Sequence, residues 1–121
     1  MLAPLRRIGK DKLDFFSAIH NKDTEWFKRI IVEMPQLAKM TDIEGVKMSM
    51  LEFVALEGGT AEMVDILIAY GANVNSSIDV GETSQTPLDV AIKNRNKAVF
   101  GALRAHGGKT FAELADGARH E

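Results

Sequence analysis

The sequence predicts an all-α fold in which helix–turn–helix units follow one another along the chain, as in repeat proteins. Three segments, residues 13–34, 49–71 and 86–107, share a short apolar helix, a polar turn and a second apolar helix. Equivalent residues in the first helices are Phe15, Leu51 and Leu88, at intervals of 36 and then 37 residues. Because one helix pair cannot bury its own apolar face, we expect the three pairs to stack.

The second helix of each unit carries apolar residues at helical spacing. These positions are Trp26, Phe27, Ile30, Ile31 and Met34 in the first unit, Met63, Val64, Leu67 and Ile68 in the second, and Val99, Ala102 and Leu103 in the third. We expect these faces to form the core, with Trp26 and Phe27 bridging to the second unit.

Helix start and stop signals recur at matching places. A hydroxyl residue followed three positions later by a carboxylate forms a capping box, in which each side chain satisfies a backbone amide of the other residue. Gly71 and Gly107 follow second helices, where a left-handed C-terminal cap favours glycine. The predicted capping pairs are Ser49 with Glu52, Thr86 with Asp89, and Thr110 with Glu113.

The third unit opens with TPLDVAI, residues 86–92, and the second ends with YGANVN, residues 70–75. In these motifs the chain resembles the ankyrin-repeat family, whose units open with T-P-L-H-x-A. AHGGKTFAEL, residues 105–114, is similar to an ankyrin C-terminal cap. Asp89 replaces the usual histidine, the first unit lacks both motifs, and the intervals exceed the family period of about 33 residues.

The resemblance implies a single ankyrin-repeat solenoid with lengthened, hairpin-like fingers. Residues 1–10 would be an N-terminal cap segment, and residues 11–48 the first repeat with its finger. Residues 49–85 would be the second repeat and finger, residues 86–109 the third repeat, and residues 110–121 a C-terminal cap and tail.

Composition excludes several classes of function. The chain has 121 residues, no cysteine, and 15 basic against 17 acidic residues, for a net charge of −2. This balance gives no argument for a nucleic-acid partner, and no segment approaches the roughly 20 apolar residues of a membrane helix. The absence of cysteine fits a cytoplasmic location, with a periplasmic or secreted one as the alternative if a leader was removed.

Catalytic and metal-binding patterns are also missing from the sequence. His20, His106 and His120 show no metal-ligand spacing, and we expect neither an enzyme nor a cofactor. Asp79 and Glu82 share one connection and are the basis of a less favoured alternative, a small metal- or ligand-binding protein.

The resemblance implies binding of another protein through the fingers and the outward positions late in the first helices. The connections carry apolar residues that either pack inward or form an exposed strip for a partner. We hypothesise that these apolar residues anchor a partner inside a charged rim. The anchors are Ile43, Val46, Ile78 and Val80, the rim is Glu44, Lys47, Asp79 and Glu82, and the helix positions are Leu56, Glu57, Lys93 and Asn94.

The sequence therefore predicts a non-catalytic protein-binding module. One form of this hypothesis is an inhibitor or immunity-type protein that inserts a finger into a partner enzyme. The other form is an adaptor that recruits a partner and needs two distinct surfaces. We expect a monomer, with a dimer formed through the fingers as the alternative.

Overall fold

The computed structural model describes residues 15–41, 48–76, 78–80 and 83–119, so the expected cap segment at residues 1–10 lies outside it. Apart from two strands of three residues, every element in these ranges is a helix, which confirms the all-α class. Residues 15–20 are helical, and the other elements are α3 (Thr24–Glu33), η1 (Pro35–Lys39), α4 (Met50–Leu56), α5 (Ala61–Ala69), β1 (Ile78–Val80), β2 (Thr83–Gln85), α6 (Pro87–Lys93), α7 (Lys97–Ala105) and α8 (Phe111–Arg119).

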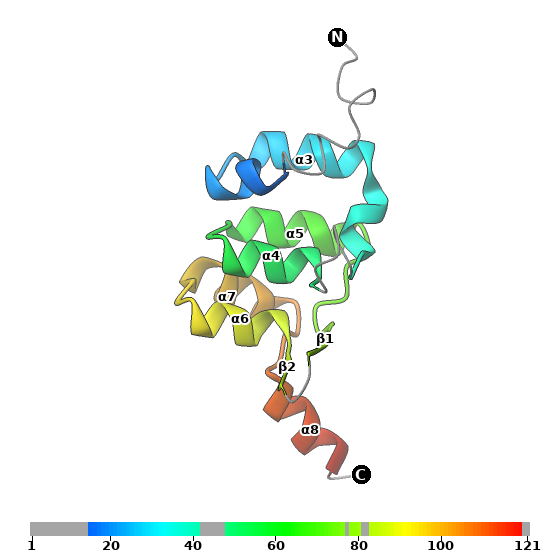
Figure 1. The fold of residues 1–121 in the computed structure, drawn as a ribbon, viewed down its shortest axis with the longest axis vertical. Coiled ribbons are helices and arrows are strands. Elements are labelled where there is room, and N and C mark those ends of the chain that lie inside the picture. The colour runs from blue at the N-terminus through cyan, green and yellow to red at the C-terminus, as the bar shows by residue number, and fades with distance from the viewer. Residues whose placement is uncertain (1–14, 42–47, 77, 81–82, 120–121) are drawn as a thin grey trace.

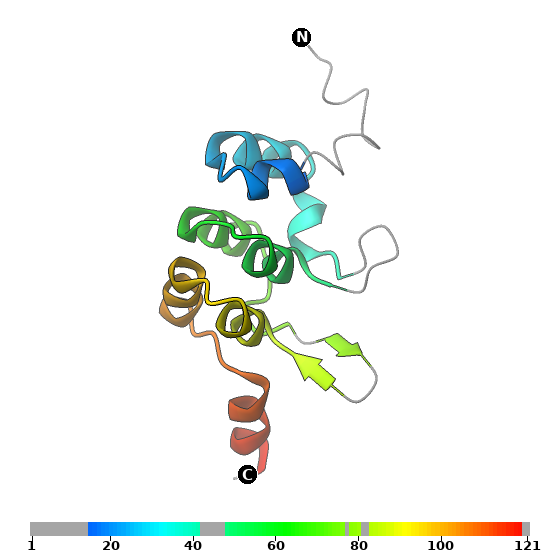
Figure 2. The same ribbon diagram turned by 60° about the vertical axis from the view of Figure 1, so that its left-hand side comes forward.

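The helices lie in layers of two (Figure 1). Residues 15–20 and α3 form the first pair, α4 and α5 the second, and α6 and α7 the third. Helix α3 packs on α5, α5 packs on α7, and α4 packs on α6. The β1–β2 hairpin projects from the stack, and α8 extends beyond the third pair (Figure 2).

The helix ends form as their sequences predict. In each capping box the hydroxyl accepts a hydrogen bond from the backbone N–H three residues on, and the carboxylate accepts one from the backbone N–H of the capping residue. Gly71 and Gly107 adopt φ of 101° and 89°, which confirms the left-handed C-terminal caps. The three confirmed boxes are Ser49 with Glu52, Thr86 with Asp89, and Thr110 with Glu113.

Apolar side chains from all three pairs form one continuous core. Phe27 is completely buried, whereas Trp26 is half-buried and packs at the edge of this core. Burying a side chain of this size stabilises the fold by about 1.5–3 kcal/mol. The largest fully buried side chains are Phe15, Ile19, Phe27, Ile31, Leu37, Met50, Leu51, Met63, Leu67, Leu88 and Leu103.

The first long connection begins with the short 3-10 helix η1, within residues 11–48, the range predicted to hold the first repeat and its finger. Leu37 and Ala38 in this helix are buried, and η1 packs against α3 and α4. Pro35 at its start fixes a backbone angle compatible with a helix and needs no hydrogen-bond partner. Part of the added length between the first two units therefore belongs to the core.

The carboxylate of Glu52 is an exception among charged groups because it lies inside the stack, with only 2% of the residue exposed. It accepts hydrogen bonds from the backbone N–H and the hydroxyl of Ser49, at 3.0 and 3.2 Å. Burial raises the pKa of Glu52 despite these hydrogen bonds, and the charge of Asp89 raises it further. The helix cap is thus built on a group whose charge is costly to bury.

Candidate functional site

The turns that join the two helices of each pair lie along one side of the stack, opposite the side that carries the β1–β2 hairpin (Figure 1). Each turn contains a left-handed residue: Lys22 with φ of 56°, Gly58 with φ of 81°, and Arg95 with φ of 56°. A polar side chain then caps the second helix by accepting from the backbone N–H three residues later. These capping residues are Asp23, Thr60 and Asn96.

Hydrogen bonds between equivalent positions hold neighbouring turns together. The Lys22 ammonium group donates to the backbone carbonyl of Gly58. The side-chain amide of Asn96 donates to the carbonyl of Gly59 at 3.4 Å. The hydroxyls of Thr24 and Thr60 lie 3.3 Å apart. These contacts fix the three turns as one continuous surface.

A pocket of about 290 Å³ opens on this surface, and we call it the turn pocket. Three of its eight lining residues are cations and none is acidic. The lining residues are Lys22, Ala55, Leu56, Gly58, Asn94, Arg95, Asn96 and Lys97. In a chain with a net charge of −2, this is a local concentration of positive charge.

The helix positions predicted to bind a partner lie on the same side of the stack as the turns. Leu56 is 40% exposed, and it lines the turn pocket with Asn94. Glu57 is half-buried next to Leu56, and Lys93 is exposed at the end of α6. The structure therefore places all four of these residues beside the turns.

The finger residues are not brought to this site. Ile78, Asp79 and Val80 form β1, which pairs antiparallel with β2 at the opposite end of the third pair. Helix α6, with seven residues, separates the hairpin from the turn by about 10 Å. The remaining predicted finger residues, which lie outside the described ranges, are Ile43, Glu44, Val46, Lys47 and Glu82.

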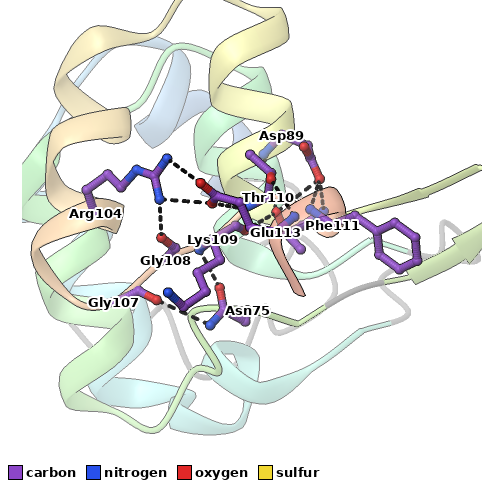
Figure 3. Close-up of polar contacts among 10 residues, drawn as sticks. Asn75, Asp89, Arg104, Gly107, Gly108, Lys109, Thr110, Phe111 and Glu113 are labelled. Carbon is purple, nitrogen blue, oxygen red and sulfur yellow. Dashed lines mark hydrogen bonds and ion pairs between the residues drawn. The ribbon is translucent and has the colours of Figure 1, made fainter. Parts of the chain in front are cut away.

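A second polar cluster joins α8 to the rest of the fold (Figure 3). Arg104 donates to both carboxylate oxygens of Glu113, at 3.0 and 3.1 Å. This guanidinium group lowers the pKa of Glu113 to about 2, and the hydrogen bond from the Thr110 backbone lowers it as well. The carboxylate of Asp89 accepts from the backbone N–H of Phe111 at 2.8 Å.

The same cluster extends to the loop that precedes the hairpin. The side-chain oxygen of Asn75 accepts from the backbone N–H of Lys109 at 2.7 Å, and its amide nitrogen donates to Gly107. The side chains of Asn75, Asp89, Arg104 and Glu113 are hydrogen-bonded to one another or to backbone groups (Figure 3). This arrangement positions a terminal helix, and we assign it no chemical role.

Within the described ranges, no group of three or more His, Cys, Asp or Glu residues is placed to hold a metal ion. His106 lies 2.8 Å from the carboxylate of Asp65 in an exposed pair. The alternative of a metal- or ligand-binding protein depends on Asp79 and Glu82, and Glu82 lies outside those ranges.

The sequence analysis missed Lys22, Arg95 and Lys97 as members of a site. Lys22, Gly58 and Arg95 stand at matching positions, 36 and 37 residues apart, near the start of each second helix. Aligning the three turns would have shown that Lys22 and Arg95 flank the turn of the middle unit. The unit alignment itself is therefore the signal that could have found them.

Comparison of the chain with protein-family models, curated proteins and solved structures finds no match in any of the three. In the part of the chain that the structure describes, no helix combines the length and apolar character needed to cross a membrane. Because none of the three comparisons finds a match, membership of the ankyrin-repeat family is a proposal.

Proposed function

We propose that this chain is a non-catalytic protein-binding module of the ankyrin-repeat type. The observation that carries the proposal is a stack of helix pairs with a hairpin projecting from one side (Figure 2). Exposed residues such as Leu56 and Lys93 lie beside the turns on the opposite side. Recognition residues commonly lie on loops that a rigid scaffold positions. Hydrogen bonds between successive turns supply that rigidity here.

One form of the proposal is an inhibitor or immunity-type protein that inserts a finger into the active site of a partner enzyme. It is supported by the projecting hairpin, whose strands pair Ile78 with Gln85 and Val80 with Thr83. A narrow two-stranded projection suits a concave partner surface.

The second form is an adaptor, and a specific observation favours it. An adaptor needs two separate binding surfaces, and the turn pocket lies at the opposite end of the helix pairs from the hairpin. Both surfaces can be occupied at once because they do not overlap.

The first experiment uses the full chain, tagged and immobilised, as bait in an extract of its native source. The test variant is the double substitution Ile43→Asp/Ile78→Asp in the fingers. Val32→Asp is the matched control, because Val32 is an exposed apolar residue on α3, outside the fingers. Circular dichroism of each bait must show equal helix content.

Capture of one protein by the unmodified chain and by Val32→Asp, but not by the finger variant, would support the proposal. The captured protein is then purified, and calorimetry measures its affinity for each variant. Loss of its catalytic activity on binding indicates an inhibitor, whereas a ternary complex with a second captured protein indicates an adaptor. Equal affinity for all variants would overturn binding through the fingers.

A further inference from the structure

Among the residues that the structure describes, two cations of the turn pocket have no partner. Neither Arg95 nor Lys97 makes a side-chain hydrogen bond or ion pair with any residue in the described ranges. Lys22, the third cation, reaches the pocket while its ammonium group donates to Gly58. Three like charges around one pocket repel each other, and an anion entering it relieves that repulsion and gains charge-assisted hydrogen bonds.

An apolar pocket of about 230 Å³ lies beside the turn pocket. Ile92 and Phe100 supply its apolar lining, and Ile92 is 49% exposed. The equivalent residues of the second unit, Ala55 and Val64, are completely buried. The third unit therefore leaves large apolar side chains partly exposed at positions that are buried in the second unit.

Both pockets are lined by the same turn, residues 95–97. A single extended segment that crosses this turn can place one side chain in each pocket. Alternate residues of an extended segment lie on the same face and about 6.6 Å apart, so an acidic and an apolar residue two positions apart can both point towards this surface.

We propose that this end of the third unit binds an acidic linear segment of a partner protein. One Asp or Glu carboxylate of the segment occupies the turn pocket with Lys22, Arg95 and Lys97, and a nearby apolar side chain occupies the pocket of Ile92 and Phe100. The proposal rests on the proposed function, since it names the chemistry of one partner at a surface remote from the fingers. Charge complementarity selects this partner over a neutral or basic one.

The test uses capped ten-residue peptides of Gly and Ser that contain one Glu and one Leu, two positions apart, in both orders. Each peptide is titrated into the ¹⁵N-labelled full chain, and amide shifts report the position and strength of binding. We expect the largest shifts at residues 22, 56–58, 92–97 and 100. We also expect the affinity to fall as sodium chloride is raised, because salt screens the ion pairs.

Matched variants separate the two pockets. Arg95→Asn/Lys97→Gln removes both unpaired cations, and asparagine tolerates the left-handed turn. We expect this variant to weaken binding about tenfold or more. Ile92→Ser should weaken binding severalfold, whereas Lys28→Gln and Val32→Ser, both on α3, should leave it unchanged. Peptides with Gln in place of Glu, or Ala in place of Leu, should bind correspondingly less.

Several outcomes would overturn the proposal. These are the absence of shifts at millimolar peptide, shifts elsewhere on the chain, and equal affinity for the Glu and Gln peptides. Inorganic phosphate is titrated in parallel, and equal shifts with phosphate would reveal a simple anion site instead of a peptide surface. If the peptides fail while the finger variant still loses its captured partner, only this inference falls. If the peptides fail and the finger variant also captures its partner as well as the unmodified chain does, the proposed function is overturned as well.

Discussion

Lys22 and Arg95 adopt the same left-handed backbone conformation, with φ of 56°, in the turns of the first and third helix pairs. Gly58 occupies the matching place in the second pair, with φ of 81°. Non-glycine residues pay about 1–2 kcal/mol for this conformation. Lys22 and Arg95 are two of the three cations that line the turn pocket, and both are held where glycine would be the less strained residue.

The first prediction concerns this strain. We expect Arg95→Gly to raise the free energy of unfolding by about 0.5 kcal/mol, because relief of strain slightly exceeds the added freedom of the unfolded chain. Lys22→Gly should gain less, since it also loses the hydrogen bond to Gly58. Urea unfolding measures both. Arg95→Ala is the control, because alanine keeps the backbone strain. If Arg95→Ala raised the free energy of unfolding as much as Arg95→Gly, relief of strain could not be the cause.

The second prediction compares two glycines. Gly101 lies inside α7, and a Cβ atom added there meets no atom of the described residues within 4 Å. Gly101→Ala should therefore stabilise the protein by about 0.5–1 kcal/mol. At Gly108 an added Cβ would lie 2.7 Å from the backbone oxygen of Leu103. We expect Gly108→Ala to cost about 1–3 kcal/mol. Denaturant midpoints test the opposite signs, and two changes of the same sign would refute this account.

The third prediction concerns the buried carboxylate of Glu52. Its pKa in the folded protein is raised above the ordinary value of 4.5. The folded protein therefore binds a proton at this carboxylate more tightly than the unfolded chain does. The ionised group therefore lowers stability as pH rises from about 4.5 through the raised pKa. Glu52→Gln keeps a residue that suits a capping box and removes the charge. We expect the stability of this variant relative to the unmodified chain to increase with pH.

Urea unfolding at several pH values between 4 and 8 measures that difference. Glu62→Gln is the control, because Glu62 is an exposed carboxylate in the first turn of α5. A difference between Glu52→Gln and the unmodified chain that stays constant with pH would show that burial of the charge has no such effect.

The fourth prediction concerns Glu113, whose pKa is lowered to about 2 by the Arg104 guanidinium group. The unfolded chain protonates this group near its ordinary value of 4.5, so its contribution to stability is complete above that value. The contribution is lost as pH falls towards 2. Carboxyl carbon chemical shifts should give a midpoint near 2, and Arg104→Met should move it towards 4.5. A midpoint near 4.5 in the unmodified chain would disprove the pairing in solution.

The helix boundaries were predictable because they depend on local chemistry. Ser49 and Thr86 form their caps with residues three positions away, and Gly71 and Gly107 relieve a constraint that acts within one turn of helix. The identity of the core was also readable from apolar spacing. The burial of Trp26 was less predictable from this spacing. Trp26 is only half-buried, and that depends on which neighbouring elements cover it and not on its place in its own helix.

The turn pocket was not predictable from any one unit. Its cations come from the first and third pairs and meet only because the second pair places Gly58 between them. Lys22 and Arg95 adopt a left-handed backbone conformation, which in a sequence is usually signalled by glycine. Because neither residue is glycine, the sequence carries no such signal. The helix η1 was missed for a related reason, since Leu37 and Ala38 become core residues only when α3 and α4 pack beside them.

Helix α8 is attached to α6 through Asp89 and to α7 through Arg104. The backbone of Lys109, just before α8, is attached to the loop that contains Asn75. These attachments have a mechanical consequence. A force that pulls on the last helix loads three separate parts of the fold in parallel, so the force is shared among them instead of breaking one bond after another. We expect the last helix and the third pair to detach in a single rupture, with the first two pairs still folded.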